Sequence, residues 1–138
     1  MSIDSTWDVQ SAVFTKLTAD SVLTSLLADG ANGILDHVPS GTNAPYVVLG
    51  ETRSEPMDTS ATSGYEVVLT IHTYSRELGM GEARQIMSAI YNSLHRVSFA
   101  VSNQNLILCR LLDTETRLEA DGQTRHGIQR FLIVTEPV

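Results

Sequence analysis

The feature that most constrains the fold is a change of period along the chain, from the two-residue repeat of a strand to the helical repeat of about 3.6 residues. Over residues 65–74, Val67, Leu69 and Ile71 alternate with mostly polar side chains, which indicates a strand with one buried face. Over residues 83–94, apolar side chains recur three and four positions apart, which predicts an amphipathic helix. Because each element must bury its apolar side against another, the chain is expected to adopt an α+β fold.

The remaining segments fit this fold class. Residues 106–112 are apolar at both odd and even positions, which predicts a central strand covered on both faces. Ile128, Leu132 and Val134 alternate along the last strand. We expect a single domain, 1–138, with a small, mostly antiparallel or mixed sheet, an N-terminal helical pair and one long amphipathic helix packed on it. The helical pair is expected over residues 9–17 and 22–27, and the earlier strands over 33–38 and 46–50.

The segment from Arg53 to Gly64 has no core-forming period and is rich in Ser and Thr. It is expected to be a long polar loop, forming the mobile tip of a hairpin between two strands. Long polar loops are frequently functional. We therefore predict that this segment is a docking element that orders when it meets a partner.

The net charge of −7 arises from nine Lys and Arg against sixteen Asp and Glu. Residues 1–69 contain nine acids and two bases, whereas residues 70–138 contain seven acids and seven arginines. An acidic chain lacks the basic surface that grips nucleic acid or anionic lipid. No leader segment, membrane span or membrane partner is expected.

Candidate catalytic groups are sparse. Cys109 lies among apolar residues, which is typical of a buried thiol and not of a nucleophile. The four histidines have no metal-site spacing. Gly79-Met80-Gly81 lacks the rest of a phosphate-binding motif. We predict no catalytic residue, no cofactor and no metal. Two other classes stay open: a small cytoplasmic enzyme using Cys109 with a histidine, and a small-molecule binding module.

Four ordered stretches carry a resemblance to a known family. They are the helical start through residues 26–28, then 34–41 with 44–51, then 72–76 leading into 81–95, and finally 121–127 with 130–131 and 135–136. Their order and spacing resemble the tail-completion, or tail-terminator, proteins of long-tailed bacteriophages, prophages and gene transfer agents. The resemblance covers about the whole chain, except for residues 53–64.

The resemblance implies a structural virion protein and not an enzyme. Such proteins form a hexameric ring that caps the tail tube, ends tail growth and joins the tail to the head-neck complex. The implied partners are other copies of the chain, the major tail tube protein and a head-neck connector or adaptor, with DNA passing through the lumen without specific binding. The implied location is the virion tail near the neck, after assembly in the host cytoplasm. A tail-tube or neck-adaptor subunit is the alternative.

The uneven charge suggests which residues meet in such a ring, because a ring needs two unlike faces on each subunit. We predict that the subunit interface includes arginines of the second half: Arg76, Arg84, Arg110, Arg117, Arg125 and Arg130. An acidic lumen would repel phosphate. We predict that the docking loop or channel includes Glu51, Arg53, Glu55, Asp58 and Glu66.

Overall fold

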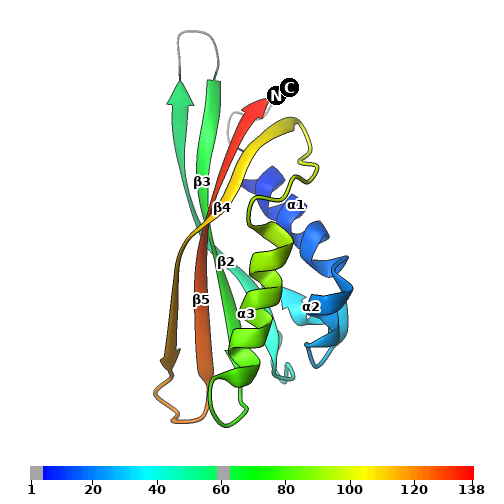
Figure 1. Ribbon diagram of the computed structural model, residues 1–138, viewed down its shortest axis with the longest axis vertical. Helices are drawn as coiled ribbons and strands as arrows, with labels where there is room; N and C mark the ends of the chain where they lie inside the picture. Colours follow the sequence, from blue (N-terminus) through cyan, green and yellow to red (C-terminus); the bar gives the residue numbers. More distant parts are fainter. Residues whose placement is uncertain (1–4, 59–62) are drawn as a thin grey trace.

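The fold is built on a five-stranded sheet with the helices on one of its faces (Figure 1). The computed structural model describes residues 5–58 and 63–138. The elements are α1 (Thr6–Thr18), α2 (Ser21–Ser25), the 3-10 turn η1 (Gly30–Gly33), β1 (Ile34–Leu35), β2 (Tyr46–Asp58), β3 (Ser63–Ser75), α3 (Gly81–Leu94), β4 (Gln104–Leu118) and β5 (Arg125–Pro137). The predicted α+β fold, with its helical pair and one longer helix, is confirmed.

The strand order is β1-β2-β3-β5-β4. β1 runs parallel to β2, and every other neighbouring pair is antiparallel, so the sheet is mixed. β1 is shorter than the strand expected over residues 33–38. The described ends of β2 and β3 extend beyond the helices at the top of Figure 1.

The core lies between the helices and one face of the sheet. Leu69 and Ile71 of β3 are fully buried, as their alternation predicts, and Leu69 pairs with the fully buried Phe131 of β5. Ile86 and Ile90 of α3 belong to the same buried cluster. Burying each of these large side chains contributes roughly 1.5–3 kcal/mol, so this layer holds α3 on the sheet.

The expected long loop between Arg53 and Gly64 is wrong. β2 and β3 pair residue by residue from Arg53 opposite Val68 to Asp58 opposite Ser63. Pro56 is tolerated because β1 pairs with β2 only at residues 47 and 48, so Pro56 lies where β2 forms an edge of the described sheet. The polar composition reflects a hairpin arm that extends from the body. Residues 59–62, the tip of the predicted docking loop, lie outside the described residues, as does the side chain of Asp58.

The expectation of a doubly covered central strand at residues 106–112 is also wrong, because β4 is an edge strand. Ile107 is 55% exposed and Leu112 is 40% exposed. The register shifts between Leu106 and Leu108 and again between Leu111 and Asp113. Each bulge inserts one residue, so that the side chains facing the core change from odd-numbered to even-numbered positions or back. The apolar residues at both odd and even positions therefore reflect two bulges and not two covered faces.

β5 presents apolar side chains on both of its faces. Phe131 and Ile133 are fully buried on the helix side. Ile128, Leu132 and Val134 do alternate along the strand, but they lie on the opposite face of the sheet. The alternation alone therefore identified the strand without identifying its covered face.

Candidate functional site

The face of the sheet opposite the helices, here called the helix-free face, gathers most of the predicted functional residues. Cross-strand pairing puts the predicted acids and arginines of four strands on one side. Its polar members are Glu51, Arg53 and Glu55 of β2, Glu66, Thr70 and His72 of β3, Arg110, Asp113, Glu115 and Arg117 of β4, and His126 and Arg130 of β5. Apolar side chains such as Val68 and Leu132, which pair across β3 and β5, lie between them.

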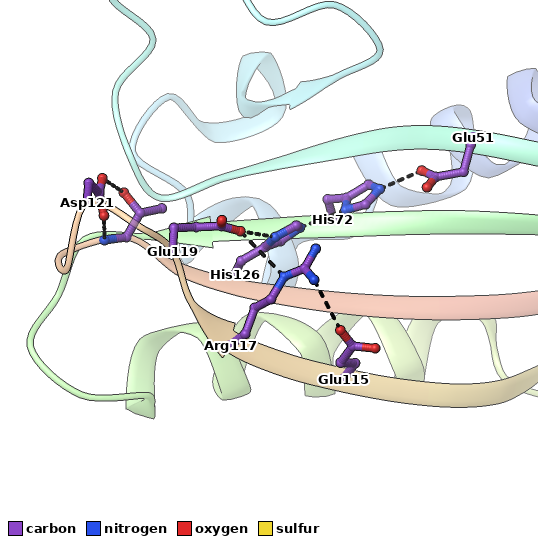
Figure 2. Close-up of polar contacts among 8 residues, drawn as sticks. Glu51, His72, Glu115, Arg117, Glu119, Asp121 and His126 are labelled. Atoms are coloured by element: carbon purple, nitrogen blue, oxygen red, sulfur yellow. Dashed lines mark hydrogen bonds and ion pairs between the residues drawn. The ribbon is translucent and has the colours of Figure 1, made fainter.

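A chain of four side chains crosses this face from β2 toward the residue that follows β4 (Figure 2). Glu51 Oε1 lies 2.7 Å from His72 Nε2, and His72 Nδ1 lies 2.7 Å from His126 Nε2. His126 Nδ1 in turn contacts Glu119 Oε1. The chain links β2, β3, β5 and Glu119, which directly follows β4, and we call it the histidine network.

The contacts of the histidine network fix how many protons it needs. Ionised carboxylates only accept, so the three contacts require three N–H donors, while two neutral imidazoles supply two. One additional proton satisfies every contact. A second would set two N–H groups against each other between His72 and His126.

The surroundings of His126 disfavour its charged form. Burial lowers the pKa of His126 below its ordinary value, although the hydrogen bond to Glu119 opposes this effect. The hydrogen bond from His72 lowers the pKa of Glu51. Because burial disfavours the charged form of His126, its Nδ1–H donates to Glu119 and its Nε2 is left as an acceptor facing His72.

Aromatic rings continue the network toward the sheet edge. The rings of Tyr74 and His126 stack with centroids 4.4 Å apart, and Tyr46 stacks on Tyr74 at 5.2 Å. His126 is 4% exposed. These contacts hold the imidazole of His126 in one orientation. Sequence reasoning missed His126, Tyr74 and Glu119, because their proximity depends on the pairing of β3 with β5.

Several of the predicted interface arginines have acidic partners within the chain. Arg130 Nη1 lies 2.7 Å from Asp113 Oδ1. Arg117 lies between Glu115 and Glu119, at 3.5 and 3.7 Å. Arg53 of β2, which was predicted for the docking loop or channel, pairs with Glu55. Exposed pairs of this kind contribute about 0–1 kcal/mol to stability, but they neutralise the face locally.

The other predicted arginines are dispersed. Arg76 follows β3 and donates to Gln123 and Thr124 at 2.6 and 3.1 Å, near Asp121. Arg125 donates to the Gln123 carbonyl at 3.0 Å. Within residues 5–58 and 63–138, Arg84 of α3 and Arg110 of β4 have no carboxylate partner. The structure therefore does not bring all six predicted arginines into one surface.

The sequence-predicted thiol lies away from this chemistry. Cys109 is 2% exposed on β4, and burial raises the pKa of its thiol to about 12. A protonated thiol is a poor nucleophile near neutral pH. Among the described residues, no group of three or more His, Cys, Asp or Glu side chains is arranged to hold a metal ion. None of the described helices is long and apolar enough to cross a bilayer.

Comparison with known proteins relates this arrangement to phage tails. The family described as Tail completion protein gp17 matches residues 11–136. The Tail completion protein gp17 of Bacillus phage SPP1 is 23% identical over 124 residues, covering 89% of this chain and 92% of that protein. A chain in the virion of a native gene transfer agent particle has the same fold, with a TM-score of 0.84 and 24% identity over 93% of this chain and 94% of that one.

The family match extends from within α1 to within β5 and so includes the helix-free face and its network. The resemblance suggested by the sequence is confirmed. This chain belongs to the Tail completion protein gp17 family and is a structural protein of the virion tail.

Proposed function

We propose that six copies of this protein form a ring that caps the tail tube near the neck, ends tail growth and joins the tail to the head-neck connector. The observation that carries the proposal is the family match over residues 11–136. The proposed partners are other copies of the chain, the major tail tube protein and a connector or adaptor protein. The protein acts by binding and not by catalysis, which the buried Cys109 supports.

The two faces of the sheet support a ring of unlike surfaces. One face is covered by helices, while the helix-free face is broad and bears both apolar and charged side chains. A closed ring requires each subunit to meet its neighbours through two different surfaces. The sheet also has two different edges, formed by β1 with the outer part of β2 and by β4.

The charge of the helix-free face supports a channel that DNA can pass. Carboxylates outnumber guanidinium groups on this face. The carboxylates belong to Glu51, Glu55, Glu66, Asp113, Glu115 and Glu119, and the guanidinium groups belong to Arg53, Arg110, Arg117 and Arg130. An acidic surface repels phosphate and limits adhesion. We propose that this face, or its Glu51, Glu55 and Glu66 end, approaches the lumen.

Native mass spectrometry and negative-stain microscopy of the purified protein test the ring. The proposal predicts a closed species of six copies that does not stack further. Open polymers of indefinite length would instead favour a tail-tube subunit. A persistent monomer at all concentrations, with or without tube protein, would contradict the proposed ring.

A further inference from the structure

β2 contains a bulge at the point where the histidine network reaches it. The register of β2 on β3 shifts between Leu49 and Thr52, where Gly50 and Glu51 together lie opposite one residue of β3. A bulge of this kind bends its strand and can re-aim a side chain. Glu51 contacts His72 of β3 from this bulge. The network is therefore attached to β2 at the irregular point of that strand.

The part of β2 beyond the bulge, Thr52–Asp58, is held on one side, and we call it outer β2. It pairs with β3, and within the described chain no strand pairs with its other side, because β1 reaches only Val47 and Val48. Pro56 also removes one backbone N–H from this segment. By contrast, β3 and β5 each have a strand on both sides. Outer β2 is therefore held less firmly than β3 or β5.

The ring of His72 lies between β2 and β5 and contacts residues of both strands (Figure 2). On the β5 side, its Nδ1 lies 2.7 Å from His126 Nε2. On the β2 side, its Nε2 lies 2.7 Å from Glu51 Oε1. The ring also lies directly against Gly50, because a Cβ there would be 2.6 Å from His72 Cδ2. A movement of this ring away from β5 therefore presses on the bulge.

His126 is held more tightly than the groups on the β2 side. Its residue is 4% exposed, and its ring stacks on Tyr74 with centroids 4.4 Å apart. The side chain of Glu51, in contrast, is 71% exposed. A repulsion between the two imidazole rings is therefore relieved on the side of His72, Glu51 and outer β2.

The number of protons on the two rings decides whether they attract or repel each other. With one proton more than two neutral imidazoles, each of the three contacts in the network has one donor. A further proton places an N–H group on both His72 Nδ1 and His126 Nε2, which face each other at 2.7 Å. Two N–H groups cannot form a hydrogen bond with each other, and two imidazolium charges repel. The contact between the rings then has to open.

The surroundings set the pH at which this further proton is bound. Charged or titratable groups face the rings or their hydrogen-bond partners from every neighbouring element. They are Tyr46 and Glu51 of β2, Tyr74 of β3, Glu115 and Arg117 of β4, Glu119 after β4, and Arg130 of β5. Burial and the charge of Arg117 lower the pKa of His126, whereas Glu119 opposes them, so the further proton is bound below the ordinary value of 6.5.

We propose that the histidine network is a pH-sensitive latch on outer β2. The latch is closed while His126 Nε2 accepts a hydrogen bond from His72 Nδ1, and it opens when both of these nitrogens carry protons. Opening displaces the His72 ring toward Gly50 and loosens outer β2 from β3, while β3, β5 and β4 stay paired. The latch goes beyond the proposed ring and does not depend on it. It makes the acidic end of the helix-free face respond to mild acid.

Amide hydrogen exchange of the full chain, followed by NMR, tests the latch. Protection factors are compared between about pH 7 and about pH 5, where histidines take up protons. They correct for the intrinsic effect of pH on exchange. In the wild type, acidification is expected to lower the protection of outer β2 on the order of ten-fold. The amides that join β3 to β5 are expected to keep their protection.

Two variants remove the conflict between the rings. His126→Phe and His72→Phe each leave one titrating ring in the network, so N–H cannot face N–H in either protein. Both variants are expected to show no selective loss of protection at outer β2 on acidification. Either variant alone is sufficient for the comparison. His37→Phe, at an exposed position after β1, keeps both rings and is expected to behave as the wild type.

Three results would overturn the latch. The first is an equal selective loss of protection in the wild type and the phenylalanine variants of the network. The second is unchanged protection of outer β2 in the wild type at about pH 5. The third is a loss spread evenly over all strands, because it reports global destabilisation and not a local opening. A missing ring in native mass spectrometry would leave the reading of this test unchanged.

Discussion

The burial of His126 makes its contribution to the stability of the protein depend on pH in a defined direction. Burial lowers the pKa of His126, whereas the unfolded chain restores its ordinary value near 6.5. As the pH falls below about 6.5, the unfolded state therefore binds protons more readily than the folded state. Acidification in this range therefore lowers the contribution of His126 to the free energy of unfolding.

The titration of His126 in the unfolded chain sets an upper limit on this change in the free energy of unfolding. If His126 stays neutral in the folded protein between about pH 7.5 and about pH 5.5, its contribution to the free energy of unfolding falls by about 1.4 kcal/mol. The hydrogen bond to Glu119 reduces this change. Glu51 does not contribute in this window, because its lowered pKa affects stability only below the ordinary value of 4.5.

Charged and titratable groups face His126 from several elements. His72 faces it from β3, Glu119 from the end of β4, and Arg117 from β4, while Tyr74 stacks on its ring. The arginine and the tyrosine do not change charge in this window. The positive charge of Arg117 lowers the pKa of His126 further and so does not reverse the direction, while Tyr74 stays neutral.

The assay is urea denaturation of wild type, His126→Phe and His37→Phe at both pH values. His126→Phe retains an aromatic ring beside Tyr74 and removes the titrating group, so its loss on acidification should be smaller by up to about 1.4 kcal/mol. His37 is exposed, and His37→Phe should behave as wild type. Equal losses in wild type and His126→Phe would refute the reasoning.

Three further perturbations test other parts of the structure. Phe131→Ala, at a fully buried position, should lower the free energy of unfolding by about 3–5 kcal/mol in denaturant titrations; a loss below about 1 kcal/mol would contradict the described core. Cys109 should resist thiol reagents in the native protein and react in denaturant, and rapid native labelling would reopen the enzyme hypothesis. Gly50→Ala should displace the His72 ring, because a Cβ there would lie 2.6 Å from His72 Cδ2. NMR chemical shifts of the His72 ring check this, and unchanged shifts would contradict the geometry.

The fold class could be predicted because local periods report local structure. The alternation around Leu69 and the helical spacing around Ile86 each reflect burial of one face, and both elements form where expected. The extent of β2 could not be predicted in this way. Its outer part contains Arg53, Glu55 and Pro56, which pack against no core, and only cross-strand pairing with β3 makes it regular.

The periodicity of the sequence could not reveal that β4 lies at the edge of the sheet. Bulges near Leu106 and Leu111 shift the side-chain parity, so the apolar run imitates a strand covered on both faces. Many predicted residues do share one surface, but their partners could not be foreseen. Arg130 meets Asp113, and His72 meets His126, only because β5 lies between β3 and β4 in the sheet.

We propose that this protein caps the tail tube and ends its growth. The most direct measurement is electron microscopy of particles or tail tubes assembled with and without this chain. With the chain, the account predicts tubes of uniform length that carry one ring at the head-proximal end. Without it, tubes should be longer and variable and should fail to join heads. Tubes of unchanged length and normal joining in its absence, or copies of this chain along the whole tube, would contradict the account.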